Sequence, residues 1–148
     1  MKNKLRIELV YSKLRELKNS LHYVKEFLPS DYNFLKDRKD KNALYKEVEF
    51  AIQLMIDICA IIHSDIGKTT PSDENDIISE IGKVGVLSKG IIEKVLSMKG
   101  FRNLLVHRYE KLDDKIAYES IKSGLDDFDI FIEEIEKFLK KHQSQKPI

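Results

Sequence analysis

Apolar residues recur every three or four positions along most of the chain, which is the spacing of one face of an α-helix. The first stripe predicts a helix over residues 4–28, which Pro29 ends because proline disfavours the helical conformation in the residue before it. The stripe consists of Ile7, Val10, Leu14, Leu17, Leu21, Val24 and Leu28.

A second helix is predicted over residues 33–64, and it is apolar on most of its circumference. Its main stripe is Leu44, Val48, Ala51, Ile52, Met55, Cys59 and Ile62, and its other faces carry Phe50, Leu54, Ile58 and Ile61. Such a helix belongs in the centre of a bundle or in a dimer interface. Its first part, residues 36–41, is nearly all charged and is expected to project into water.

Shorter helical stretches follow. Residues 70–73 have the composition of a helix start, with a hydroxyl, a proline and an acid, so a helix is predicted over residues 71–83. Gly85 is expected to close it in a left-handed conformation. Another helix is predicted over residues 88–99, with a break or kink at Gly100 and helix again over residues 101–109.

The last predicted helix covers residues 114–141 and follows a turn that supplies its N-cap. Its stripe is Tyr118, Ile121, Leu125, Phe128, Ile132, Ile135 and Leu139. The polar tail, residues 142–148, is expected to be frayed. Long amphipathic helices with short connections predict an all-α protein, with a single domain over residues 1–148 that is an antiparallel helical bundle of about five helices.

Composition limits the function only loosely. Of the 148 residues, 42% are hydrophobic and 34% are charged, which is typical of a folded globular protein. The net charge of +1 lacks the basic excess of proteins that coat long nucleic acids, although a nuclease needs only a local patch. A single cysteine, Cys59, excludes an intrachain disulfide. With no signal peptide and no apolar run of membrane-spanning length, we expect a cytoplasmic protein.

The residues best suited to chemistry are Arg102, His107 and Tyr109. Histidine exchanges protons near neutral pH, and the planar charged fork of arginine matches a phosphate. Together they can cleave RNA without a metal, because the imidazole deprotonates a ribose 2′-hydroxyl and the guanidinium stabilises the phosphate, leaving a 2′,3′-cyclic phosphate. No metal or cofactor is expected, since His63 and Asp65 alone are a poor metal site and no Glu-x-x-His pair occurs.

The spacing adds a constraint. On an ideal helix, residues five apart are separated by about 140° around the axis and roughly 7.5 Å along it, so Arg102 and His107 do not share a face. Either the helix bends or a second subunit completes the site. The pattern also arises by chance in many helices. In that reading His107 caps a helix end, Arg102 pairs with an acid, and Tyr109 is a core ring.

Asp57 is an acid inside the apolar central helix, where burial without a partner is costly. We expect it to form a hydrogen bond near the motif helix and to orient Arg102. An Asp57→Ala variant with unchanged stability and activity would contradict this hypothesis.

The pattern Arg-x4-His-x-Tyr, formed by Arg102, His107 and Tyr109, resembles the signature of HEPN domains. It is most similar to the HepT-like toxins, which pair with minimal nucleotidyltransferase (MNT) antitoxins. The further matches are Asn103, Leu112, Asp113 and the segments 51–59 and 81–87, of which the first segment resembles the family's central helix. The resemblance covers nearly the whole chain.

This resemblance implies properties that the residue pattern does not give. Proteins of the family form homodimers with facing motifs and are metal-independent endoribonucleases or RNA-targeting toxins. By this carry-over, Arg102 and His107 are catalytic, Asn103 helps to shape the pocket, and Tyr109 receives AMP from the nucleotidyltransferase antitoxin. The chain is therefore expected to be the toxin of a type II toxin–antitoxin system, with a second copy, an MNT-type antitoxin and RNA as partners.

Two other functions stay open. Some HEPN relatives are non-catalytic partners of nucleotidyltransferases that bind nucleotide, and a structural dimer in a larger complex also fits the pattern. RNA cleavage in EDTA that is lost in His107→Ala would distinguish the toxin from both.

Overall fold

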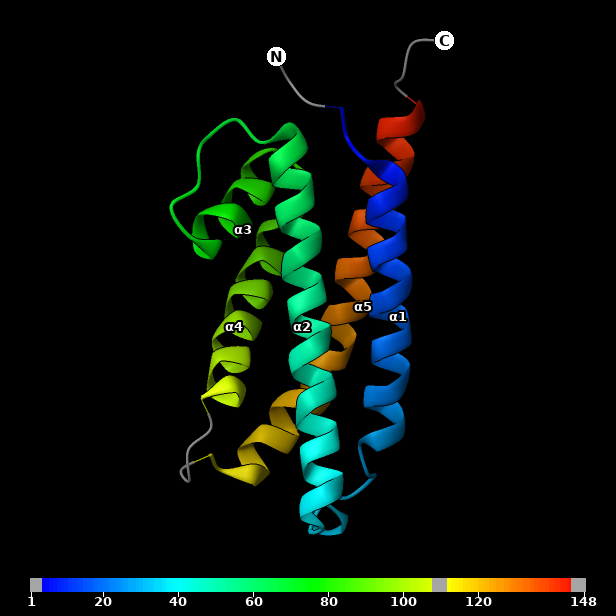
Figure 1. Ribbon diagram of the computed structural model, residues 1–148, viewed down its shortest axis with the longest axis vertical. Helices are drawn as coiled ribbons and strands as arrows, with labels where there is room; N and C mark the ends of the chain where they lie inside the picture. Colours follow the sequence, from blue (N-terminus) through cyan, green and yellow to red (C-terminus); the bar gives the residue numbers. More distant parts are fainter. Residues whose placement is uncertain (1–3, 108–111, 145–148) are drawn as a thin grey trace.

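The computed structural model describes residues 4–107 and 112–144, and these ranges contain helices but no strand. The helices are α1 (Ile7–Phe27), the short 3-10 helix η1 (Tyr32–Phe34), α2 (Arg38–Ile66), α3 (Glu74–Lys83), α4 (Lys89–Val106) and α5 (Asp114–Ser144). The predicted all-α bundle of five α-helices is confirmed (Figure 1).

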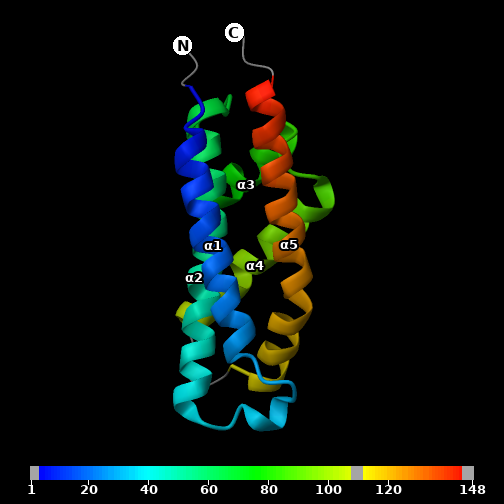
Figure 2. The ribbon, with the colours of Figure 1, turned by 90° about the vertical axis from the view of Figure 1, so that its right-hand side faces the viewer.

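Helix α2 lies at the centre of the bundle, because it packs against α1 on one side and against α3 and α4 on the other (Figure 1). Figure 2 shows α1 and α5 side by side along the length of the molecule. The long helices α1, α2, α4 and α5 alternate in direction, as expected of an antiparallel bundle. Burial in α2 raises the pKa of the Cys59 thiol to about 12, so this residue is a buried apolar side chain.

The predicted apolar stripes form the core. Every position of the α2 stripe is buried, and so are Leu54 and Ile58 on its other faces. The stripes of α1 and α5 are buried except for Leu28 and Leu125, which are partly exposed. Phe131 is fully buried although it lies outside the α5 stripe, because α5 is covered by both α1 and α4.

Helix α2 begins at Arg38, so the predicted start at residue 33 is wrong. The residues before it form η1, which Asp31 caps by accepting a hydrogen bond from the backbone N–H two residues later. Asp37 caps α2 in the same way, at 2.7 Å. The sequence pattern indicates one helix here. It is divided in two because Asp31 caps the start of η1 and Asp37 caps the start of α2. Residues 36–40 are exposed, as predicted, whereas Lys41 is half-buried and forms an ion pair with Asp114 at 2.7 Å.

Helix α3 begins at Glu74, so the predicted start at Pro71 is also wrong. The cap is Asp73, whose side chain accepts a hydrogen bond from the backbone N–H of Asp76 at 2.9 Å. Because aspartate caps a helix better than threonine does, this contact decides where the helix begins. Gly85 has a φ of 82°, which confirms the left-handed closure predicted for it.

Helix α4 runs without interruption through Gly100, so the predicted break there is wrong. Glycine in a helix interior costs only about 1 kcal/mol relative to alanine. Apolar residues of α4 that pack on the core on both sides of Gly100 offset this cost. They are Ile91, Ile92, Val95 and Leu105. The helix ends at Val106, before the predicted end at Tyr109, and residues 108–111 lie outside the described part of the chain.

Helix α5 begins at Asp114, as predicted. The side chain of Asp113 caps it by accepting hydrogen bonds from the backbone N–H groups of Lys115 and Ile116, at 3.0 and 3.1 Å. The helix continues to Ser144, so residues 142–144 of the expected tail are helical. None of the helices in the described ranges has the length and apolar character that a membrane span requires.

A buried acid fixes α3 to the end of α2. Glu80 accepts a hydrogen bond from the backbone N–H of Lys68 at 2.7 Å and another from the hydroxyl of Thr69, and it lies 3.3 Å from the buried ring of His63. The Lys68 N–H, and after it His63, hold the pKa of Glu80 below its ordinary value. Asp65 has a different partner, the side chain of Arg6, so His63 and Asp65 do not converge on one site.

Candidate functional site

The last turns of α4 carry motif residues to a hollow between α2, α3 and α4, with a volume of about 440 Å³. Its lining residues are Lys46, Glu49, Phe50 and Gln53 from α2, Glu74 from α3, and Arg102, Asn103, Val106 and His107 at the end of α4. The structure therefore brings Arg102, Asn103 and His107 to one hollow. Tyr109 lies outside the described residues.

Arg102 is held firmly at the wall of the hollow, where its side chain is 11% exposed. Nη1 donates to Gln53 Oε1 at 2.7 Å and to Glu74 Oε2 at 3.4 Å, and Nη2 donates to Glu74 Oε1 at 2.9 Å. Nε and Nη2 both donate to Asn103 Oδ1, at 3.2 and 2.9 Å. All five N–H groups of the guanidinium are thus engaged. Arg102 thus pairs with an acid, Glu74, which is the contact that the chance reading anticipated, while its side chain also lines the hollow.

Gln53 connects Arg102 to Asp57, one turn further along α2. Gln53 Nε2 donates to Asp57 Oδ1 at 2.9 Å, while Gln53 Oε1 accepts from Arg102. The carboxylate fixes the orientation of the amide, because only a donor can face it, and the amide oxygen is then left to face the guanidinium. Asp57 reaches the motif helix through Gln53 rather than directly. That it orients Arg102 stays a prediction.

His107 directly follows the last helical residue of α4. Its backbone N–H donates to the carbonyl oxygen of Asn103 at 3.0 Å, so it caps the helix end. Its side chain is exposed and has no hydrogen-bond or ionic partner among residues 4–107 and 112–144. An imidazole in this setting can exchange a proton with a bound substrate.

Arg102 and His107 line the same hollow although an ideal helix would place them on different faces. Two features account for this. The long side chain of Arg102 extends from α4 to α2 and α3, where its partners are. His107 lies beyond the helix, with φ −99° and ψ 26°, and so departs from helical geometry. A single chain therefore brings both groups to one place.

The rim of the hollow combines balanced charge with exposed apolar side chains. Lys46 and Glu49 form an ion pair at 3.4 Å. Phe50 and Val106, which line the hollow, are 47% and 50% exposed, and Leu104 on the same turn of α4 is 59% exposed. Large apolar side chains gathered at this exposure favour a surface that another protein covers.

Gln53 and Glu74 are site residues that the sequence pattern does not single out. Gln53 carries a weak signal, because it lies four positions before Asp57 and such pairs share a helix face. Glu74 carries none, since it is 28 positions from Arg102 and the two meet only through the packing of α3 against α2 and α4.

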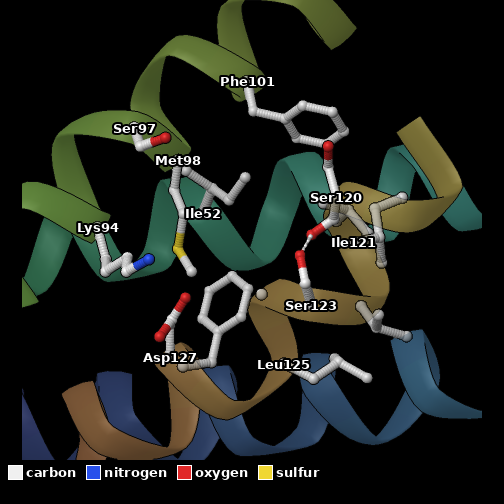
Figure 3. Close-up of a pocket in the computed structure, with 14 residues that line it drawn as sticks. Ile52, Lys94, Ser97, Met98, Phe101, Ser120, Ile121, Ser123, Leu125 and Asp127 are labelled. Atoms are coloured by element: carbon white, nitrogen blue, oxygen red, sulfur yellow. Dashed lines mark hydrogen bonds between the residues drawn. The ribbon is translucent and has the colours of Figure 1, made fainter. Parts of the chain in front are cut away.

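A second cavity, of about 220 Å³, lies on the other side of α4, where α4 faces α5 (Figure 3). Apolar side chains such as Ile52, Met98 and Phe101 line it together with the charged Lys94 and Asp127. Its lining includes no histidine, no arginine and none of the motif residues. The chemistry of the motif is therefore directed to the hollow between α2, α3 and α4.

Comparison with known proteins places this chain in a family. The chain matches the family described as ribonuclease HepT-like over residues 17–135. It is 23% identical over 121 residues to a putative RNase of Archaeoglobus fulgidus, a match that covers 82% of this chain and 91% of that protein. It is 20% identical over 128 residues to the mRNA nuclease HepT of Shewanella oneidensis, covering 86% of this chain and 96% of that protein.

Solved structures share the fold. One is a tri-AMPylated HEPN toxin of Shewanella oneidensis in complex with MNT antitoxin, with a TM-score of 0.79, 20% identity and coverage of 86% of this chain and 96% of that one. Another is the cytosolic protein YutE of Bacillus subtilis, with a TM-score of 0.80, 16% identity and coverage of 100% and 98%. The family match spans most of the chain and includes both Arg102 and His107, and this protein is therefore a member of the HepT-like ribonuclease family.

Proposed function

We propose that this protein is the toxin of a HEPN/MNT toxin–antitoxin pair and that it cleaves RNA at the hollow between α2, α3 and α4. The observation that carries the proposal is that a firmly held guanidinium, that of Arg102, and an exposed imidazole, that of His107, line one hollow. Membership of a ribonuclease family and similarity to an mRNA nuclease support RNA as the substrate.

The two side chains have complementary roles in this reaction. The imidazole of His107 accepts the proton of a ribose 2′-hydroxyl, whose oxygen then attacks the adjacent phosphorus. The guanidinium of Arg102 stabilises the negative charge on the phosphate oxygens. The bond between phosphorus and the 5′ oxygen breaks, the 5′ oxygen takes up a proton, and a 2′,3′-cyclic phosphate remains. Side chains supply both the charge and the base, so no metal ion is needed. DNA is not cut, since it has no 2′-hydroxyl.

The working form in this proposal is a homodimer. The exposed apolar side chains of Phe50 and Val106 line the hollow, and a second copy would cover them. A two-fold axis there would set the two motifs against each other. A Val106→Asp variant is expected to be monomeric in size-exclusion chromatography with light scattering, whereas a dimeric Val106→Asp variant would contradict this arrangement.

The proposal also names a partner. A solved relative is a tri-AMPylated toxin in complex with MNT antitoxin, and by resemblance Tyr109 is the residue that would receive AMP in this chain. The intact mass of protein co-expressed with an MNT-type nucleotidyltransferase tests this, because each AMP adds a fixed increment. The increment is expected to disappear in Tyr109→Phe, and an increment that persists in Tyr109→Phe would contradict the assignment.

Cleavage in the presence of EDTA tests the mechanism. Purified protein is incubated with single-stranded RNA beside His107→Ala and the matched control His22→Ala, whose ring is exposed on α1. We expect the wild type and His22→Ala to cleave the RNA and to leave cyclic phosphate ends, and His107→Ala to be inactive. Cleavage by His107→Ala, or by no variant, would count against the mechanism. Nucleotide binding without cleavage would instead favour a non-catalytic partner of a nucleotidyltransferase.

A further inference from the structure

The guanidinium of Arg102 has no N–H group left for a substrate. Its five N–H groups are engaged by side chains of Gln53, Glu74 and Asn103. Arginine binds phosphate most strongly through two parallel N–H···O contacts. A phosphate that enters the hollow must therefore take the place of one of these three partners.

The three partners are not equally replaceable. Gln53 belongs to the central helix, is half-buried and is held by its own hydrogen bond to Asp57. Asn103 is the next residue on the same helix, so it moves with Arg102. Glu74 differs from both, because its side chain is 36% exposed and it is the first residue of α3. Its carboxylate also faces Nη1 and Nη2 with its two oxygens, at 3.4 and 2.9 Å, as the two free oxygens of a phosphodiester would.

The buried residues of α3 are Ile78, Glu80 and Ile81, and none of them lies in the first turn of the helix. Its first turn is exposed at Asn75 and Asp76, and Asn75 accepts an exposed hydrogen bond from Lys99 of α4 at 2.9 Å. Glu74 is not among the buried residues of α3, so its side chain can leave Arg102 with less loss of packing than Gln53, which lies on the central helix.

From these observations we propose that Glu74 occupies the phosphate-binding edge of Arg102 in the free protein and that a phosphate of the RNA displaces it. The inference rests on the proposed function and deepens it, because it names the group with which the substrate competes. Gln53 and Asn103 keep the guanidinium in place during the exchange. Because Glu74 must be displaced, a single free anion binds poorly, and a chain with several phosphates has the advantage.

Binding of an uncleavable RNA tests the proposal. The probe is a short fluorescent single-stranded RNA with 2′-O-methyl riboses, and its affinity is measured by fluorescence anisotropy. Glu74→Gln keeps the shape of the side chain but removes the charge that competes with phosphate. The matched control is Glu49→Gln, which removes the same charge from the same hollow without a contact to Arg102. We expect roughly five-fold tighter binding in Glu74→Gln and a smaller change in the control.

Repeating the measurement in an Arg102→Ala variant distinguishes the effect of the Glu74–Arg102 contact from the effect of removing a negative charge from the hollow. There, Glu74→Gln is expected to change affinity no more than Glu49→Gln does. Glu74→Asp is a second variant with a shorter carboxylate, and it too should bind the RNA more tightly than the wild type. Thermal unfolding verifies that each variant is folded. Equal effects of Glu74→Gln and Glu49→Gln, or weaker binding by a folded Glu74→Gln, would overturn the proposal.

The outcomes separate this inference from the proposed function. If the wild type cleaves unmodified RNA but its Glu74 and Glu49 variants bind alike, the inference is wrong and the function stands. If binding depends on Glu74 and Arg102 but no RNA is cleaved, the function is wrong and the inference stands. If no variant binds RNA at all, both are wrong.

Discussion

Arg102 and His107 are only five positions apart, yet they stand in opposite settings. The side chain of Arg102 is 11% exposed and is bonded by residues of α2, α3 and α4. The side chain of His107 is exposed and has no partner within the described ranges. The difference fits the roles that we propose for the two groups. A charge that receives a phosphate gains from being held in place beforehand, whereas a base must reach both substrate and solvent.

This contrast teaches that the two halves of the site depend differently on the fold. The position of Arg102 relies on Gln53 and Glu74 from two other helices, so changes far along the chain alter it. The position of His107 relies only on the end of its own helix. Variants can therefore separate residues that act in the reaction from residues that hold another group in place.

The largest effect is expected from the two motif residues themselves. His107→Ala and Arg102→Ala should each lower the rate of RNA cleavage by roughly 10²- to 10⁴-fold. Arg102→Ala should also lower the free energy of unfolding by about 1 kcal/mol, because Gln53 and Glu74 lose their partner. His107→Ala should change it by less than about 0.5 kcal/mol. Urea unfolding measures the free energy of unfolding of each variant. Equal losses in Arg102→Ala and His107→Ala would contradict the contrast between a held and an exposed side chain.

A smaller effect is expected at Gln53. Gln53→Leu removes the acceptor for Arg102 and the donor to Asp57. We expect kcat to fall by roughly ten-fold, because the guanidinium is less well placed. The control is Gln143→Leu, an exposed glutamine on α5. A folded Gln53→Leu variant with the kcat of the wild type would show that Asp57 and Gln53 do not position Arg102.

The next effect concerns stability in acid. The Lys68 N–H and His63 hold the pKa of Glu80 below the ordinary value of 4.5, so this carboxylate contributes stability that is present above that pH and is lost as the pH falls through the lower, folded-state pKa. Glu80→Gln should lower the Tm at neutral pH. The difference in Tm between Glu80→Gln and the wild type should become smaller below about pH 4.5. The matched control is Glu133→Gln, which removes a carboxylate from the exposed face of α5. A difference that stays constant with pH would contradict this role.

The smallest effect is expected in the cavity between α4 and α5. A Cβ at Gly124 would lie 3.6 Å from Met98 Cε, an ordinary contact, so Gly124→Ala should stabilise the helix by about 0.4–1 kcal/mol and leave RNA cleavage unchanged. The matched control is Gly82→Ala, whose Cβ would lie 2.8 Å from Ile92 Cγ1 and should lower the Tm. Reduced cleavage in Gly124→Ala would mean that this cavity belongs to the site.

Much of the fold could be predicted from local pattern. The long helices follow from their apolar stripes, and the start of α5 follows from the cap at Asp113, because periodicity and capping are local properties. The starts of α2 and α3 could not be predicted, since several neighbouring residues are capable caps and differ by little free energy. The break expected at Gly100 failed because core packing on both sides of it outweighs the preference of a single glycine.

In the candidate site, too, some residues could be predicted from local sequence and others could not. Arg102 and His107 are recognisable in the printed chain, because charge, proton affinity and short spacing belong to the residues themselves, whereas Asn103 is identified only through the family resemblance. The partners of Arg102 are not recognisable there. Gln53 is 49 positions away and Glu74 is 28, and only the packing of three helices brings them within hydrogen-bonding distance. The sequence alone thus determines which reactive side chains are present. The hydrogen-bond partners of the Arg102 guanidinium depend on contacts between distant segments, which are brought together only in the folded structure.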